Sequence, residues 1–248
     1  MKKLYEKNEM TFAITWIVIY CALQSLAYPL NEKIGIPYIA SAVFCVLQAI
    51  LLFAFIWKNK LLKQYGFCKS PVSASRFLFY IPLVILATRN FWNGTAFNLN
   101  AAGTACYIVC MLCVGFVEEV IFRGFLFRAI AKDNVKTGIV ISSLTFGLGH
   151  LLNLVNGSGM ELTENLFQIT GAIAIGFLFV ILYDLGGSLL PCIMTHSAIN
   201  MTSVFADETG LTAEKRIIFQ LILVIITVVY ALILTKTLPQ SKSVNTNK

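Results

Sequence analysis

The chain has 248 residues, of which 58% are hydrophobic and only 12% are charged, and its mean hydropathy is +0.78. Because soluble domains carry about 25% charged residues, this composition excludes an ordinary water-soluble protein. The net charge of +7 does not indicate nucleic-acid binding, since that function needs a basic face exposed to water. We therefore expect the lipid bilayer to surround the chain, with no nucleic acid as a partner.

Apolar stretches recur along the whole sequence, and each is long enough to cross a hydrocarbon core of about 30 Å as a helix. Breaks rich in proline, glycine, asparagine or charge separate them. The fold class that this predicts is all-α: a single polytopic membrane domain over residues 1–248, with about eight transmembrane helices. In chain order the expected spans are 11–28, 36–57, 76–92, 102–122, 138–155, 166–183, 188–205 and 217–235.

The positions of the basic residues test this assignment, because lysine and arginine accumulate in cytoplasmic segments. With the N-terminus inside, only Lys33, Arg89, Lys215 and Arg216 fall on the outer side. This predicts a multi-pass protein of the cell membrane with both termini in the cytoplasm. The inner side collects Lys2, Lys3, Lys7, Lys58, Lys60, Lys63, Lys69, Arg76, Arg123, Arg128, Lys132, Lys136, Lys236, Lys242 and Lys248.

The fourth stretch, 102–122, differs from the others in two ways. Its apolar pattern continues through Arg128, which predicts an amphipathic helix near the cytoplasmic surface. It also carries Cys106, Cys110 and Cys113, spaced as in a radical iron–sulfur motif. The spacing i, i+4, i+7 places the three thiols on one face of a membrane helix, however, so we favour packing over metal binding.

Ionisable side chains inside a span cost at least about 2.5 kcal/mol each, so they are candidates for function. The fourth stretch carries Glu118 and Glu119. The fifth carries His150, and the seventh carries His196, with Asn200 one turn later. The chain has no other histidine. Any one of these residues alone could be structural, but their joint position near the middle of three spans predicts a polar cluster.

Helix geometry separates the roles of the two glutamates. Adjacent residues point about 100° apart, so the two side chains should not aim at the same point. Glu119 and Arg123 are i and i+4, the favourable order for an ion pair. Glu118 lies three residues after Gly115, where the missing side chain would leave room for a substrate backbone. We therefore predict that Glu118 carries the chemistry and that Glu119 and Arg123 support it.

The same spacing groups the remaining polar residues. His150 follows Phe146 by four residues, so the aromatic ring can fix the imidazole from one face of the helix. His196 and Asn200 are also i and i+4, and this pair can donate two hydrogen bonds to one oxygen. These residue types suit amide hydrolysis, which needs an activated water and donors aimed at the developing oxyanion.

In this hypothesis Glu118 is the general base, because a carboxylate in a medium of low dielectric is a better base than one in water. His150 would hold the same water, and His196 with Asn200 would stabilise the oxyanion. A metal is the alternative, since Glu118, His150 and His196 match the ligand set of a zinc hydrolase. A His-Glu-x-x-His helix is absent from the sequence. The sequence leaves open whether a divalent metal such as zinc takes part.

Three short motifs resemble those of a known family. Glu118-Glu119-x-x-x-Arg123, Phe146-x-x-x-His150 and His196-x-x-x-Asn200 occur in order on separate spans. They are similar to the motifs of the CPBP intramembrane proteases, the CAAX proteases and bacteriocin-processing enzymes, also called the Abi or type II CAAX prenyl endopeptidase-like family. The resemblance covers residues 100–205, which we take as the catalytic core.

The resemblance implies hydrolysis of a peptide bond in a membrane-embedded or lipid-anchored peptide, with the residue roles described above. Members have been described both as metalloproteases and as glutamate proteases. Eukaryotic relatives trim prenylated CAAX tails, and bacterial relatives are linked to peptide maturation and bacteriocin self-immunity.

Two other functions stay open from the sequence. Buried Glu, Arg and His residues could form the ion pathway of a transporter, although no inverted repeat is visible. A membrane immunity or scaffold protein could keep the same fold without turnover.

Overall fold

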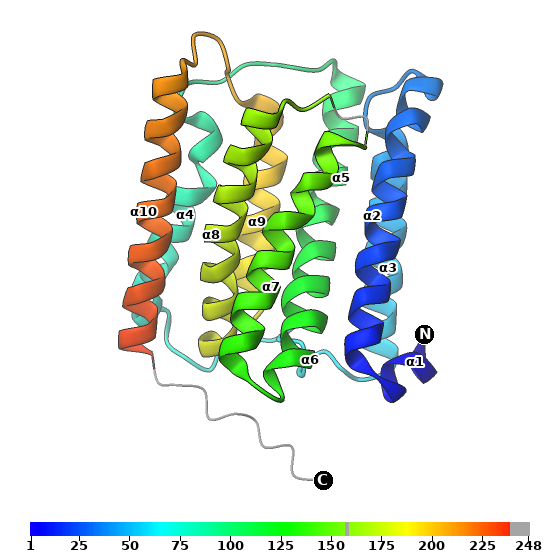
Figure 1. The fold of residues 1–248 in the computed structure, drawn as a ribbon, viewed down its shortest axis with the longest axis vertical. Coiled ribbons are helices and arrows are strands. Elements are labelled where there is room, and N and C mark those ends of the chain that lie inside the picture. Colours follow the sequence, from blue (N-terminus) through cyan, green and yellow to red (C-terminus); the bar gives the residue numbers. More distant parts are fainter. Residues whose placement is uncertain (157–158, 239–248) are drawn as a thin grey trace.

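The computed structural model describes residues 1–156 and 159–238, and in this part of the chain helices run side by side along one axis (Figure 1). No strand occurs in the described residues apart from one isolated bridge between Thr95 and Ala206. The helices are α1 (Lys2–Lys7), α2 (Glu9–Ile34), α3 (Ile39–Lys58), η1 (Ala74–Tyr80), α4 (Ile81–Ala87), η2 (Arg89–Phe91), α5 (Ala101–Glu118), η3 (Glu119–Phe127), α6 (Arg128–Ala131), α7 (Val135–Gly149), η4 (His150–Leu154), α8 (Leu162–Gly186), α9 (Leu190–Thr202), η5 (Ser203–Phe205) and α10 (Ala213–Thr237).

Six helical segments are long and apolar enough to cross a membrane, so the predicted all-α polytopic bundle is confirmed. The segments predicted at 76–92 and 188–205 are shorter helices. α4 has 7 residues because the three residues before it, 78–80, have positive φ and interrupt the helix. α9 has 13 residues and begins at Leu190, with Pro191 in its first turn, after the Gly186–Gly187 turn. The count of eight spans stays a prediction.

The fourth span does not end near residue 122 as expected. α5 continues directly into the π-helix η3 and then into α6, and every residue of η3 is buried. The prediction of an amphipathic helix at the membrane surface is therefore wrong. This segment has Glu119 and Arg123 beside its apolar residues and still has no exposed face, and Arg123, the one basic residue in η3, is 0% exposed. Arg123 consequently does not belong with the basic residues that the sequence analysis assigned to the cytoplasmic side.

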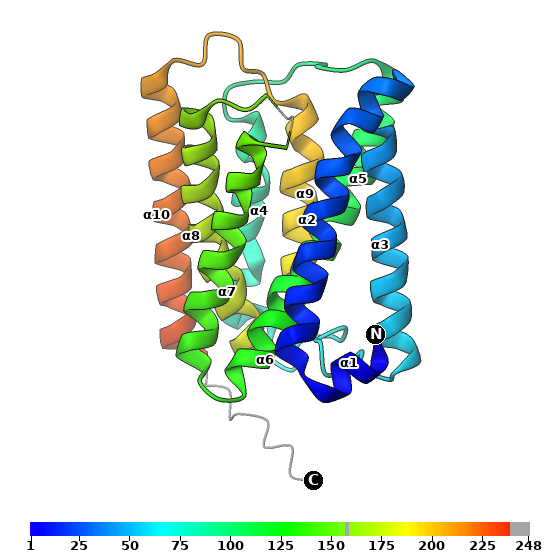
Figure 2. The same cartoon turned by 45° about the vertical axis from the view of Figure 1, so that its right-hand side comes forward.

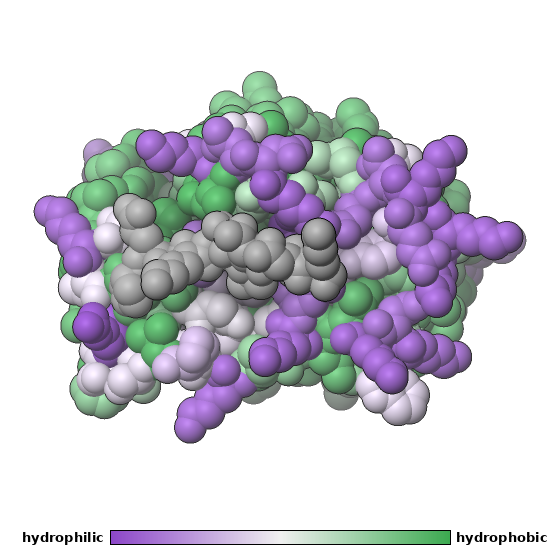
Figure 3. Space-filling view, turned by 90° about the horizontal axis from the view of Figure 1, so that it is seen from below, coloured by the Kyte–Doolittle hydropathy of each residue, from purple (hydrophilic) through white to green (hydrophobic). Residues whose placement is uncertain are grey.

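Hydrophilic side chains gather at the end of the bundle that holds the N-terminus, as Figure 3 shows. α1, the end of α3 and the turn between α6 and α7 carry lysines there. The clustering at one end agrees with the predicted distribution. Which side of a membrane this end faces stays a prediction, and residues 239–248, with Lys242 and Lys248, lie outside the described residues.

Two glycines set the helix spacing around the polar cluster. A Cβ on Gly115 would lie 2.6 Å from the backbone nitrogen of Ser197, so α5 and α9 touch there. The space beside Gly115 is thus filled by α9, and the predicted room for a substrate backbone at this glycine is wrong. A Cβ on Gly147 would lie 3.0 Å from the backbone nitrogen of Ile173, which brings α7 against α8.

The cysteines of α5 pack as small apolar side chains. Cys110 is buried with Ala42 and Cys45, and Cys106 and Cys113 pack against this cluster. The sulfur atoms of Cys45 and Cys110 are 3.7 Å apart. The packing interpretation of the three thiols of α5 therefore holds.

Candidate active site

A fully buried ion pair forms the base of the candidate site. Glu119 Oε1 lies 3.1 Å from Arg123 Nη1, and both side chains have no exposed surface. The pair predicted from the i, i+4 spacing is therefore present. The contact is not aligned as a hydrogen bond, and the guanidinium instead lies over the ring of Phe146, 4.0 Å from its centroid. Charge attraction and a cation–π contact together compensate for burying this arginine.

His196 joins the two glutamates. Its Nδ1 is 2.7 Å from Glu119 Oε1, and its Nε2 is 3.4 Å from Glu118 Oε2. The two carboxylates thus reach opposite nitrogens of one ring, although their side chains leave the helix in different directions. We expected that glutamate side chains about 100° apart would not share one target. That expectation treated the target as a point, whereas the imidazole of His196 presents two nitrogens on different edges. The close contact at Gly115 allows this arrangement, since it places α9 directly against α5.

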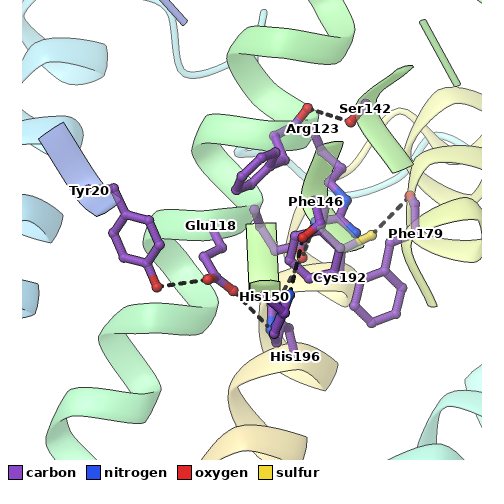
Figure 4. A network of polar contacts seen from close by, with 11 residues as sticks. Tyr20, Glu118, Arg123, Ser142, Phe146, His150, Phe179, Cys192 and His196 are labelled. Carbon is purple, nitrogen blue, oxygen red and sulfur yellow. Dashed lines mark hydrogen bonds and ion pairs between the residues drawn. The ribbon is translucent and has the colours of Figure 1, made fainter. Parts of the chain in front are cut away.

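Glu118 has a second partner from a distant part of the chain. The hydroxyl of Tyr20, on α2, donates a hydrogen bond of 2.7 Å to Glu118 Oε1. Tyr20 and His196 approach the carboxylate from opposite sides (Figure 4). Glu118 is only 8% exposed, so its orientation is set by protein groups on both oxygens. It faces the interior of the bundle and not the lipid.

Phe146 lies at the centre of the cluster and contacts both histidines. Its ring is edge-on to His150 at 5.4 Å between centroids and to His196 at 5.6 Å. Its backbone carbonyl accepts a hydrogen bond of 3.1 Å from His150 Nδ1. This bond places the proton on Nδ1, which leaves Nε2 of the neutral ring with a free lone pair. The predicted fixing of His150 by Phe146 is therefore present.

His150, the first residue after α7, is held through its backbone by a buried side-chain amide. Asn165 of α8 is 0% exposed and donates a hydrogen bond of 2.7 Å to the backbone carbonyl of His150. α7 is also attached to the π-helix η3. The hydroxyl of Ser142 on α7 donates a hydrogen bond of 2.8 Å to the backbone carbonyl of Phe122 in η3. Single π-helical turns inside longer helices are frequent at functional sites, and their carbonyls need such outside partners.

A cavity of about 610 Å³ extends from this cluster toward the loops at the opposite end from the N-terminus. Glu118, Phe146, His150 and Asn200 all line it. Asn200 follows His196 by one turn, and its side chain has no hydrogen-bond partner among the described residues. The structure thus brings the predicted residues of all three motifs to one cavity. It leaves the amide of Asn200 available to a ligand.

The three predicted metal ligands, Glu118, His150 and His196, do not all have a free donor atom in this geometry. Both nitrogens of His196 face carboxylates, which leaves only Glu118 and His150 Nε2 with capacity for an ion. In the described ranges, no three histidine, cysteine or acidic side chains come close enough to share an ion. The donor set of Glu118, His150 and His196 does not close around zinc in this arrangement, so no catalytic step is assigned to a metal. Metal dependence stays untested.

Comparison with known proteins supports the motif analysis. The sequence profile of the family described as "Type II CAAX prenyl endopeptidase Rce1-like" matches residues 100–202. Over these residues the chain is similar to the Rce1-like family. The resemblance stated from the three motifs is thus confirmed, and the match spans the segment that holds all of them. Comparisons with curated proteins and with solved structures gave no match.

The Rce1-like match also decides two broader points. Together with the six apolar helices, it shows that the chain is a multi-pass membrane protein. It supports a peptidase, hence a hydrolase, of the CAAX protease type acting on a membrane-associated peptide. The catalytic mechanism, the substrate and the metal requirement are not decided by the family match.

One residue of the site was missed by sequence reasoning. Tyr20 precedes the Rce1-like segment by 80 residues and belongs to none of the three motifs. A tyrosine in an apolar span is ordinary, so the sequence gave no reason to connect it with Glu118. The only available signal was that a buried tyrosine hydroxyl needs a partner.

Proposed function

We propose that this protein is an intramembrane endopeptidase in which Glu118 activates water for attack on a peptide bond. The observation that carries this proposal is the orientation of Glu118. Its two oxygens contact Tyr20 and His196, and its carboxylate lines the same cavity as His150 and Asn200. A carboxylate held in fixed geometry at the inner end of a cavity suits a general base.

The proposed reaction has two steps. In the first, Glu118 takes a proton from a water that is also held by His150 Nε2, and the hydroxyl oxygen bonds to the carbonyl carbon of the substrate. The negative charge that develops on the carbonyl oxygen is stabilised by the amide of Asn200, while His196, whose two nitrogens face the carboxylates, holds Glu118 in position. In the second, the C–N bond breaks while Glu118 returns its proton to the leaving nitrogen. The products are a carboxylic acid and an amine; transfer of the acid proton to the amine gives a carboxylate and an ammonium group, and no other reactant is needed.

The substrate must present an extended segment to the cavity. A peptide bond inside a helix has its carbonyl and amide engaged in intrahelical hydrogen bonds, so a membrane-embedded substrate has to unwind locally. A lipid-anchored peptide tail would meet this requirement more easily. Peptide maturation and bacteriocin self-immunity are the cellular roles that we propose for such cleavage.

The decisive experiment compares membrane peptides from cells that produce the wild-type protein or Glu118→Gln. This change keeps the shape of the side chain and removes the base, so we expect product formation to fall by about 10² to 10⁴. Glu32→Gln is the matched control, because Glu32 is an exposed glutamate on α2 that does not line the cavity. Fragments should appear with wild type and with Glu32→Gln only. Equal fragments from Glu118→Gln would refute the proposal.

The metal alternative needs a separate measurement. Purified protein would be treated with a strong chelator, assayed, and analysed for bound metal. If Glu118 acts directly on water, activity should survive chelation within about twofold. Loss of activity that returns with added zinc would instead show that Glu118 and His150 act as metal ligands.

A further inference from the structure

Arg89 was expected at the outer membrane surface, but it lies at the wall of the cavity that also contains Glu118. It belongs to the short helix η2, between α4 and the loop that leads to α5, and it is half-buried. Among the residues that the structure describes, its side chain forms no hydrogen bond, ion pair or aromatic contact. A cation in such a place is costly unless an anion accompanies it.

Every other charged group of the cavity wall has a partner. Arg216 lies 3.2 Å from Glu208 and 3.7 Å from Glu164. The carboxylate of Asp207 accepts a hydrogen bond of 2.8 Å from the backbone N–H of Thr209. Glu118 is held by its two contacts to Tyr20 and His196. Arg89 is therefore the one charged side chain of the wall that has no polar contact in the described chain.

The backbone around Arg89 is fixed against the helix that carries the third motif. The side-chain amide of the next residue, Asn90, donates hydrogen bonds to the carbonyl of Ile199 at 2.5 Å and to the hydroxyl of Thr202 at 2.8 Å. Both acceptors belong to α9, on either side of Asn200 in the sequence. η2 is thus attached to α9 on either side of Asn200 in the sequence, and Arg89 and Asn200 line the same cavity.

We propose that Arg89 binds a carboxylate of the substrate peptide and so fixes which bond reaches Glu118. This inference rests on the proposed peptidase function and specifies its substrate class: peptides that carry a carboxylate beyond the cleaved bond. A guanidinium matches a carboxylate with two parallel hydrogen bonds, and such charged pairs are strong where water is excluded. The carboxylate could be the C-terminal group or an acidic side chain, and both present the same two oxygens.

The test measures binding separately from cleavage. The probe is an apolar fluorescent peptide in three forms: with a free C-terminal carboxylate, with a C-terminal amide, and with an amide plus one internal aspartate. Full-length Glu118→Gln protein in nanodiscs of phosphatidylcholine binds the probes without turnover. We expect the carboxylate forms to bind about tenfold or more tightly than the plain amide. Whichever carboxylate form binds more tightly identifies the source of the anion.

Three further variants decide whether Arg89 causes this preference. Arg89→Gln in the same background should reduce it to less than about twofold, while Arg89→Lys should keep part of it because the charge remains. Lys33→Gln is the matched control, since Lys33 is an exposed cation near the end of α2 that does not line the cavity. It should leave the preference unchanged. If Arg89→Gln loses folding, which thermal melting would show, Arg89→Lys supplies the comparison.

Several outcomes would overturn the inference. One is equal binding of carboxylate and amide probes by the parent protein, and another is a preference that survives Arg89→Gln. If the preference is present but wild-type protein cleaves nothing in cells, the proposed peptidase function fails and the carboxylate site remains.

Discussion

The Rce1-like segment, residues 100–202, and the helices that flank it contribute differently to the site. The segment supplies every motif residue and the contacts among them, including the Glu119–Arg123 pair and the rings around Phe146. The flanks supply Tyr20, which holds one oxygen of Glu118, and Arg89, which stands at the cavity wall. In the proposed reaction the chemistry belongs to the segment, while the orientation of Glu118 and the proposed recognition of a substrate carboxylate depend on the flanks.

The arrangement of helices explains this division. In Figure 1, α2 and α3 lie on one side of the bundle and α4 and α10 on the other, with the helices of the segment between them, and Figure 2 again has α3 and α10 at opposite edges. The cavity is lined from both sides, since Tyr20 lies on α2 and Arg89 follows α4. A substrate in the cavity would therefore touch helices that the family match does not include. Variants in the segment should reduce catalysis most, and variants in the flanks should have smaller, more selective effects.

The largest of the following effects is expected inside the segment, for Asn200→Ala. If the free amide of Asn200 stabilises the oxyanion, its loss should lower kcat by about 10² to 10³ with little change in KM. Asn200→Asp is the informative companion, because it keeps the size of the side chain but replaces a donor with an acceptor. It should be at least as harmful. An active Asn200→Asp enzyme would contradict the role of a donor, and the assay is cleavage of one peptide by purified protein.

The next effect tests the contact that aligns the segment internally. In Gly115→Ala the new Cβ would lie 2.4 Å from Ser197 Oγ and 2.6 Å from its backbone nitrogen, so α9 must move away from α5. A displacement of about 1 Å between Glu118 and His196 would lower activity by about 10². Overpacking should also reduce stability by about 1–3 kcal/mol, which thermal melting would detect.

Gly124→Ala is the matched control for Gly115→Ala. It lies in the same continuous span, but its Cβ would meet Tyr65 at 3.7 Å, an ordinary contact. It should therefore change activity and melting temperature little. Equal effects from the two substitutions would show that alanine is tolerated or rejected along the span in general, and that the α5–α9 contact has no special role.

The sequence predicted much of the segment because its key contacts are local. Glu119 with Arg123 and Phe146 with His150 are separated by four residues, and the 3.6-residue period of a helix places such pairs on one face. The structure has both contacts. Six of the eight predicted apolar stretches also became helices long enough to cross a membrane. Helical periodicity and apolar length were sufficient for these features.

The errors arose where contacts between distant residues decide the geometry. The space at Gly115 is occupied by Ser197, 82 residues later, and this could not be read from α5 alone. Arg123 was placed at the surface because an arginine after an apolar run usually lies there, yet its partners Glu119 and Phe146 keep it inside. Likewise, nothing in the sequence of α2 connects Tyr20 with a glutamate 98 residues away.

The smallest effect is expected in the flank, for Tyr20→Phe. This change removes the hydroxyl that donates to Glu118 Oε1 and leaves the ring that lines the cavity. Hydrogen bonds to charged groups contribute about 1.5–3 kcal/mol, but His196 still contacts the other oxygen, so we expect kcat to fall by about tenfold with KM unchanged. Tyr230→Phe is the control, because its buried hydroxyl donates a similar bond of 2.8 Å to the carbonyl of Phe77 and does not line the cavity.

Kinetics of the double variant separate a positioning role for Tyr20 from a contact with substrate. If Tyr20 acts only by orienting Glu118, Tyr20→Phe should cost nothing further once Glu118→Gln is present, because interacting residues are not additive. A rise in KM at constant kcat, or an additional loss in the double variant, would instead show that the hydroxyl binds substrate. In either case α2 would take part in the reaction, although it lies outside the Rce1-like segment.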